Sequence, residues 1–194
     1  VYTHITELGA SGGYYVASAT DRIIASPTAI VGSIGVVALK FNIEGLLSKI
    51  GVSDETYKSG PKKDFWSPFR PSSAEEKKML QEIIDKLYAR FIGVVYSGRH
   101  NRLTEEEVKT LADGRILTAG DALQARLIDQ TAYLDETIDT MKRSLHIENA
   151  KVVTYVRPKT FTSNIYSEYS EMPLQSQQVV SLISINAEDL ALFT

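Results

Sequence analysis

The stretch Glu7-Leu8-Gly9-Ala10-Ser11-Gly12-Gly13-Tyr14-Tyr15-Val16-Ala17 decides the fold, because a strand turns into a helix within it. Residues 1–6 before it alternate and are rich in β-branched and aromatic side chains, as a strand is. Residues 14–19, which begin within the stretch, are typical of a helix that starts just beyond two glycines. The stretch therefore predicts the first strand-to-helix connection of an α/β domain.

Ser11 is a polar nucleophile at the point where this helix begins. The first N–H groups of a helix lack intrahelical partners and carry partial positive charge, so the Gly12 N–H is a candidate oxyanion donor. Residues 9–13 also match the G-x-S-x-G pattern of a nucleophile elbow, although five small residues match it easily. The alternative is a tight turn in which Ser11 only caps the helix.

The remaining chain alternates short apolar strands with amphipathic helices. This alternation predicts an α/β fold with a mostly parallel sheet. Two capping boxes, at residues 73–76 and 104–107, mark helix starts. We expect strands at 21–27, 30–37, 52–57, 113–117, 127–129 and 151–156, and helices at 41–50, 73–96, 104–112, 118–126, 134–145 and 174–193.

Composition excludes several classes of function. The chain has 194 residues, 43% of them hydrophobic, which suits a globular domain with a sizeable core. The net charge is −3 and no basic stripe is present, so we expect no nucleic-acid partner. There is no cysteine, and His4, His100 and His146 show no metal-ligand spacing, so we expect neither metal nor cofactor.

The activating base for Ser11 is less obvious. His100 and His146 follow Ser11 in the order of a nucleophile elbow, but both fall in surface-type segments. A lysine serves instead when burial or nearby positive charge favours its neutral amine. The loop of residues 58–64 offers three lysines, although a lysine-rich loop is more often simply solvated.

Six segments in a fixed order resemble one known family. They are Ala10-Ser11-Gly12-Gly13-Tyr14-Tyr15, Asp21-Arg22-Ile23 with Ser26-Pro27, Val31-Gly32-Ser33-Ile34-Gly35-Val36, Lys58-Ser59-Gly60-Pro61-Lys62-Lys63-Asp64, Ala112-Asp113-Gly114-Arg115, and residues 122–129. Together they resemble signal peptide peptidase A (SppA), and the resemblance runs over residues 1–156. It implies a Clp-protease/crotonase-like fold of repeated β-β-α units, with upstream units expected outside this sequence.

The resemblance also implies site residues. Ser11 matches the nucleophile, and Lys63, the second lysine of the K-S-G-x-x-K-D motif, matches the base of the short, single-domain members. Lys58 is the alternative base, and in long, tandem-repeat members the lysine comes from elsewhere. Ser33 resembles the residue that orients the lysine amine. Gly12 is the one oxyanion donor that the chain itself offers, since the family takes its second donor from an upstream glycine.

The family's biology implies further expectations. Its members are membrane-tethered serine–lysine endopeptidases that degrade cleaved signal peptides and assemble into rings of identical subunits. We therefore expect a peptidase domain at 1–156 and a tail at 157–194 that contacts a neighbour, a partner or the membrane. We also expect an N-terminal anchor outside this soluble stretch, in the bacterial inner membrane, with the catalytic domain on the periplasmic side. Residues 64–71 and the helix at 73–96 are expected to hold the homo-oligomer.

Two other functions remain open. A crotonase-type acyl-CoA enzyme shares the superfamily fold, but needs two oxyanion donors and a carboxylate rather than a serine and a lysine. An inactive oligomeric scaffold of the same fold is the second alternative, against which the set of Ser11, Ser33 and Lys63 argues.

Overall fold

The computed structural model describes residues 1–155. The chain divides into two units, Val1–Ala150 and Lys151–Thr194, and the elements below belong to the first. They are β1 (Tyr2–Ile5), β2 (Leu8–Ala10), α1 (Gly12–Ala17), β3 (Arg22–Ala25), β4 (Ile30–Gly32), α2 (Glu44–Lys49), α3 (Ala74–Arg99), α4 (Glu105–Leu111), β5 (Ile116–Thr118), α5 (Ala119–Gln124), β6 (Gln130–Thr131) and α6 (Leu134–Leu145).

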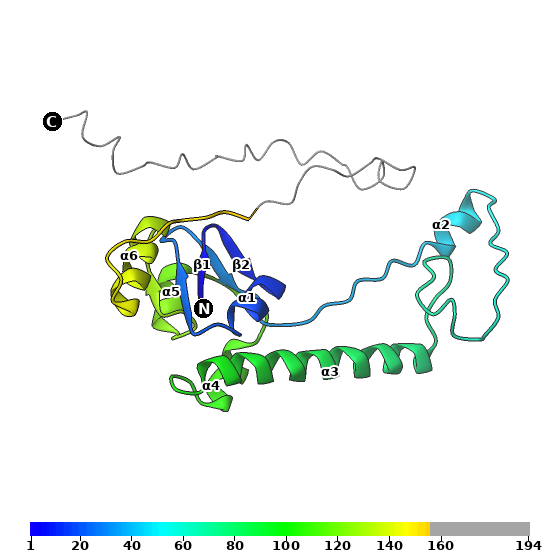
Figure 1. Cartoon of the computed structure of the whole chain (residues 1–194). Helices are drawn as coiled ribbons and strands as arrows, with labels where there is room; N and C mark the ends of the chain where they lie inside the picture. The colour runs from blue at the N-terminus through cyan, green and yellow to red at the C-terminus, as the bar shows by residue number, and fades with distance from the viewer. Residues whose placement is uncertain (156–194) are drawn as a thin grey trace. The chain divides into compact units, whose positions relative to one another are not determined.

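The strands form two three-stranded sheets. One has the order β1-β3-β6 and is parallel throughout, and the other has the order β2-β4-β5, in which only β5 runs antiparallel. The first four strands therefore alternate between the two sheets, beginning with β1 and β2, the two blue strands in Figure 1. This arrangement repeats a β-β-α unit, so the expected fold class is confirmed.

The core lies between the sheets, α1 and the C-terminal half of α3. Tyr14 is fully buried, and its hydroxyl donates to the Leu127 carbonyl at 2.6 Å. Helix α3 approaches the end of α1 so closely that a Cβ on Gly98 would lie 1.9 Å from the Ser18 carbonyl oxygen. Only glycine fits there, which fixes α3 (the long green helix in Figure 1) against the helix that follows Ser11.

Several expected elements differ from the structure. Residues 52–57 form no strand, because they are exposed and pair with no other strand in the described chain. Residues 151–155 form none either, and the expected helix at 174–193 lies outside the described residues. The strand expected at 127–129 begins at Gln130 instead, since Leu127 and Ile128 are used as core side chains in a bend.

Residues 36–72, which we call the arm, contain α2 as their one regular element. None of the side chains of α2 is buried, although the spacing of its apolar residues predicts a packed helix. Apolar side chains along the arm are exposed, among them Val37, Leu39, Phe41, Leu46, Ile50, Tyr57, Trp66 and Phe69. In the described part of the chain, no helix is both long and apolar enough to cross a membrane.

A buried carboxylate joins α3 to the sheet. Asp129, whose side chain is 1% exposed, accepts hydrogen bonds from the Arg99 guanidinium at 2.9 Å and from the Ile23 N–H at 2.6 Å, and it pairs with Arg102. Burial alone would raise the pKa of Asp129, but the bonds from Arg99 and Ile23 outweigh it and keep the pKa below its usual value.

Asp129→Ala is expected to lower the free energy of unfolding by about 3–5 kcal/mol, because it leaves the buried Arg99 unpaired. Denaturant unfolding measures the loss, and Asp139→Ala, at an exposed pair with Lys142, is the control, with a loss below about 1 kcal/mol. Since the folded state lowers the pKa of Asp129, its contribution is present above about pH 4 and disappears as pH falls through the folded value. Equal losses of unfolding free energy in the two variants would show that the buried pair of Asp129 and Arg99 stabilises the fold no more than an exposed pair does.

Candidate active site

Ser11 lies in the turn between β2 and α1 with φ 51° and ψ −116°. This left-handed φ is uncommon for a residue with a side chain and costs about 1–3 kcal/mol. Backbone bonds impose it: the Ser11 N–H donates to Gly32 O at 2.8 Å, and Ser11 O accepts the first helical bond from Tyr15. The Ser11 hydroxyl does not cap α1, so the side chain is exposed and free to react.

Strand register brings Ser33 beside Ser11. Ala10 is opposite Gly32 in the parallel pair of β2 and β4, so each serine directly follows a paired residue at the carboxyl end of its strand. Ser33 also has a positive φ, 52°, and its N–H donates to Arg115 O at 2.7 Å. Gly32, with φ 95°, must be glycine because a Cβ would lie 2.9 Å from the same carbonyl.

Ser11, Gly12 and Ser33 share one cavity of about 820 Å³. The Gly12 N–H has no hydrogen-bond acceptor within residues 1–155, so it is available to an oxyanion in this cavity. The volume falls in the range of small-ligand and peptide-binding clefts. The arrangement therefore provides a nucleophile, a free N–H donor and a second hydroxyl in one place.

Helix α3 supplies one wall of the cavity, a role that the sequence pattern did not reveal. The apolar side chains of α3 are buried only towards its C-terminal end, where Phe91, Ile92 and Val95 lie, whereas Leu87 is 53% exposed. Tyr88 is held by a bond from its hydroxyl to Ala112 O, and Tyr15 meets Phe91 edge to face. The apolar lining residues are Tyr15, Val36, Val37, Ile84, Leu87, Tyr88 and Phe91.

Charged residues of the cavity are Asp85, Arg90 and Asp113, and no lysine or histidine of the described chain lines it. Hydrogen bonds from Arg115 lower the pKa of Asp113 to about 2, so this carboxylate is ionised and paired. Among the apolar residues near Ser33 in the sequence, Val36 lines the cavity, while Val31 and Ile34 are core residues.

The three lysines of the turn at 58–64 differ in their contacts. The Lys58 ammonium binds both oxygens of Asp64 at 2.8 Å, and the Lys62 ammonium binds Glu75. The Lys63 ammonium has no hydrogen-bond or ion-pair partner among residues 1–155. The contacts thus distinguish Lys63 from Lys58, the alternative base, because Lys58 is engaged by a carboxylate.

Lys63 is not brought together with Ser11 in a single chain. Its neighbour Asp64 binds Arg70, which binds Glu76 in the first turn of α3. The Ser11 end of the cavity lies near Phe91, about 15 residues or roughly 22 Å farther along the helix. A lysine side chain, with a stem of about four carbons, does not bridge that span.

The histidines are not near Ser11 either. His100 contacts Ser97 O, His146 terminates α6 in a left-handed conformation, and His4 contacts Thr137 and Ser26. None of these three residues lines the cavity. Residues 1–155 contain no group of three or more side chains arranged to hold a metal ion.

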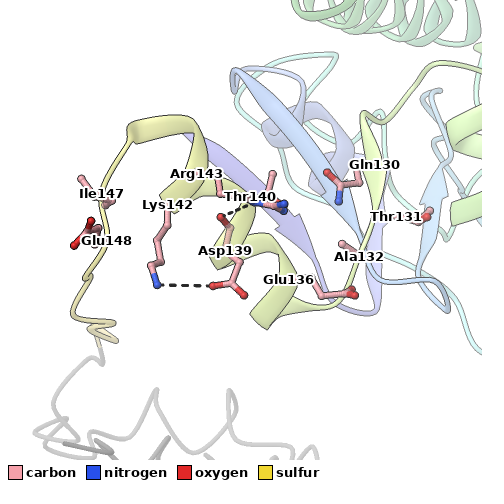
Figure 2. Close-up of a pocket in the computed structure, with 10 residues that line it drawn as sticks. All are labelled: Gln130, Thr131, Ala132, Glu136, Asp139, Thr140, Lys142, Arg143, Ile147 and Glu148. Atoms are coloured by element: carbon pink, nitrogen blue, oxygen red, sulfur yellow. Dashed lines mark hydrogen bonds and ion pairs between the residues drawn. The ribbon is translucent and has the colours of Figure 1, made fainter. Parts of the chain in front are cut away.

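A second cavity, of about 560 Å³, lies between β6 and α6 (Figure 2). Its side chains are of mixed charge, with Lys142 3.9 Å from Asp139 and Arg143 bound to Thr140 at 3.2 Å. No residue of the predicted site lines this cavity. The Ser11 cavity is therefore the candidate active site.

Two three-stranded sheets built from repeated β-β-α units, and a serine at a strand-to-helix turn, define a Clp-protease/crotonase-like α/β protein. Within that class the chain belongs to peptidase family S49, whose model matches residues 1–148. The resemblance to SppA seen in the sequence motifs is thereby confirmed.

Three relatives illustrate the similarity. A putative signal peptide peptidase SppA of Enterococcus faecium is 41% identical over 82% of this chain and 46% of its own length. A putative protease of Methanocaldococcus jannaschii is 35% identical over 80% of the chain and 49% of its own length. A putative protease of Synechocystis is 45% identical over 63% of this chain and 44% of its own length. The chain thus spans about half the length of these relatives.

Proposed function

We propose that the protein of which this chain is part is a serine endopeptidase that uses Ser11 as nucleophile and Lys63 as general base. The observation that carries the proposal is the backbone strain at Ser11, whose hydroxyl does not cap α1 and which lies next to the Gly12 N–H, a donor without an acceptor in residues 1–155. The chain that holds this serine belongs to peptidase family S49. A crotonase-type enzyme has no use for such a serine, and an inactive scaffold gains nothing from the strain at φ 51°.

The reaction begins when the neutral amine of Lys63 takes the proton from Ser11 Oγ, which attacks the scissile carbonyl. The Gly12 N–H stabilises the resulting oxyanion, with a second donor supplied from outside this sequence. The lysine ammonium returns its proton to the leaving amine, and water then releases the acyl group from Ser11. Because only the neutral amine accepts the proton, the rate rises with pH.

Ser33 orients the lysine amine in this proposal. Support comes from its position at the end of β4, next to Ser11, and from its half-buried hydroxyl, which has no partner in residues 1–155. A hydroxyl accepts a hydrogen bond from the amine and so directs the nitrogen lone pair towards Ser11.

Lys63 reaches Ser11 from a second copy of the chain. The support is the tie between Asp64 and the first turn of α3, which keeps Lys63 away from Ser11 of its own chain. The exposed apolar side chains of the arm provide the surface for the second copy, since they are numerous and the described chain leaves them uncovered. A ring of identical subunits forms when such a head-to-tail contact closes.

The substrates are signal peptides left after secretion and other unfolded, apolar peptides. The apolar wall of the Ser11 cavity and the name of the Enterococcus faecium relative support this class. Remnant signal peptides reside in the membrane, so we place the whole protein at the bacterial inner membrane, anchored by a segment outside this sequence, with the active site on the periplasmic side. A closed ring admits only unfolded chains.

Substrate preference provides the test. The full-length protein is expected to cleave unfolded peptides after small or apolar residues, and a fluorophosphonate probe is expected to label Ser11. Leu87→Glu is expected to raise KM for apolar peptides by about tenfold or more, because it places a charge in the apolar wall. Leu123→Glu, at another exposed leucine, on α5 outside the cavity, is the control.

Three results would contradict the proposal. Absence of both labelling and hydrolysis would favour the scaffold, and turnover of an acyl-CoA without labelling would favour the crotonase alternative. Preferred cleavage after Lys or Arg would show that the cavity accepts cations and would overturn the apolar substrate class.

A further inference from the structure

The turn that carries Lys63 contains no helix or strand, yet it is held by a chain of charged contacts. Backbone bonds from Lys63 N–H to Gly60 O and from Ser67 N–H to Asp64 O only close local turns. The link to the rest of the molecule is made by side chains. Two side-chain contacts reach the first turn of α3: Lys62 binds Glu75, and Arg70 joins Asp64 to Glu76.

Arg70 binds Asp64, the residue next to Lys63, through two nitrogens of its guanidinium group. Its Nε and Nη2 each donate to a carboxylate oxygen of Asp64 at 2.9 Å, and Nη2 also donates to the Asp64 carbonyl at 3.2 Å. Both the side chain and the backbone of Asp64 are thereby fixed. A paired fork of this kind is geometrically specific, which a lysine ammonium cannot reproduce.

The other edge of Arg70 binds helix α3. Nη1 donates to Glu76 at 2.9 Å, and Glu76 in turn accepts the Ser73 N–H at 2.8 Å in the capping box of α3. These bonds, that from Arg70 above all, lower the pKa of Glu76 to about 2, so the carboxylate stays ionised. The Lys63 turn is thus tied to the N-terminal turn of the helix whose middle, from Gln81 to Phe91, lines the Ser11 cavity.

The same contacts saturate Asp64. Its carboxylate, with a side chain 11% exposed, is bound by Arg70 and by Lys58 at once. Hydrogen bonds from these two cations hold the pKa of Asp64 well below its usual value. No oxygen of Asp64 is left to bind the Lys63 ammonium, although the two residues are adjacent. The other charged groups around the turn are Lys62, which binds Glu75, and Lys40, which donates to Phe65 O, Arg70 O and Ser72 Oγ.

We propose that Arg70 is a positioning residue for catalysis: it fixes the Lys63 turn on α3 and keeps the Asp64 carboxylate from pairing with the Lys63 ammonium. This inference rests on the proposed role of Lys63 as base. An ammonium paired with a carboxylate is a poor source of neutral amine. Without Arg70, Lys58 alone binds the Asp64 carboxylate, which is then free to pair with the Lys63 ammonium as well. That pairing removes the neutral base at moderate pH, and the turn is no longer tied to Glu76.

The test compares pH profiles of peptide hydrolysis by the full-length protein. Arg70→Gln is expected to lower kcat by about 10- to 100-fold with little change in KM, because the base is misplaced. It is also expected to move the rise of the rate with pH upwards by about 1–3 pH units, because Asp64 now stabilises the Lys63 ammonium. Arg70→Lys keeps the positive charge but lacks the guanidinium group. Its kcat and its pH profile are expected to fall between those of the wild type and those of Arg70→Gln.

The double variant Arg70→Gln/Asp64→Asn separates the two effects. It removes the carboxylate that Arg70 held, so the pH profile is expected to return to that of the wild type while kcat stays low. Arg126→Gln is the control, because it removes an ion pair with Glu107 that lies outside the arm. It is expected to leave both kcat and the pH profile unchanged. Light scattering on each variant verifies that assembly is intact.

Two results would overturn the inference. An unshifted pH profile in Arg70→Gln, with Lys63→Ala inactive, would refute the role of Arg70 and leave the proposed function standing. A fully active Lys63→Ala would refute the proposed base itself, and the role of Arg70 with it. If Arg70→Gln fails to assemble, the profile of Arg70→Lys decides instead, and an unshifted profile there has the same meaning.

Discussion

Ser11→Ala and Lys63→Ala are each expected to lower kcat/KM of the full-length protein by about 10⁴- to 10⁶-fold without unfolding it. Ser11→Ala removes the atom that forms the acyl bond, and Lys63→Ala removes the acceptor of its proton. Because the two act as one unit, the double variant should be little worse than either single variant. Hydrolysis of a fluorogenic apolar peptide measures the loss.

The neighbouring lysines provide matched controls. Lys62→Ala removes an exposed contact with Glu75 and is expected to leave activity near that of the wild type. Lys58→Ala is expected to lower activity only partly, because Arg70 still binds Asp64. An inactive Lys58→Ala together with an active Lys63→Ala would transfer the role of base to Lys58.

Much of the fold is predictable from local signals in the sequence. The capping boxes at Ser73 and Thr104 predict the starts of α3 and α4, and both boxes form as expected. The glycine-rich stretch around Ser11 predicts the β2–α1 turn, although the short strand β2 itself is hidden within it. These signals are local because each depends on residues a few positions apart.

The arm is the part that the sequence pattern misrepresents. Residues 52–57 have the composition of a strand, but a strand needs a partner, and none is present in the described chain. The apolar residues of α2 suggest a buried face, which the unit Val1–Ala150 does not cover. A pattern of apolar residues predicts that a surface is buried, but it does not indicate whether the same chain or another one covers it.

For the site, three of the residues singled out in the sequence lie together in the structure, whereas the side chains around them were not predicted. Ser11, Gly12 and Ser33 share one cavity, because β2 and β4 pair in the register that places their ends together. The α3 wall, with Leu87 and Tyr88, was hidden within an ordinary amphipathic stripe. The pairing of Ser11 with Lys63 stays a prediction, since it depends on contacts that one chain does not make.

Mixing two inactive variants tests that pairing directly. Ser11→Ala keeps Lys63, and Lys63→Ala keeps Ser11, so a ring built from both contains sites in which each neighbour supplies what the other lacks. If the lysine comes from the adjacent subunit, random 1:1 assembly gives about one quarter of wild-type activity, since both halves of a site must be intact by chance. That is a gain of about 10³-fold or more over either inactive parent.

The controls follow from the same geometry. The two variants are unfolded and refolded together, or co-expressed, because subunits of preformed rings need not exchange, and each variant alone is treated identically. If Lys63 instead serves Ser11 of its own chain, every subunit of the mixture lacks one member of the dyad and no activity returns. Recovery is the expected result, because the tie from Asp64 through Arg70 ends at Glu76, and about 22 Å of helix separates Glu76 from Phe91 at the Ser11 end of the cavity.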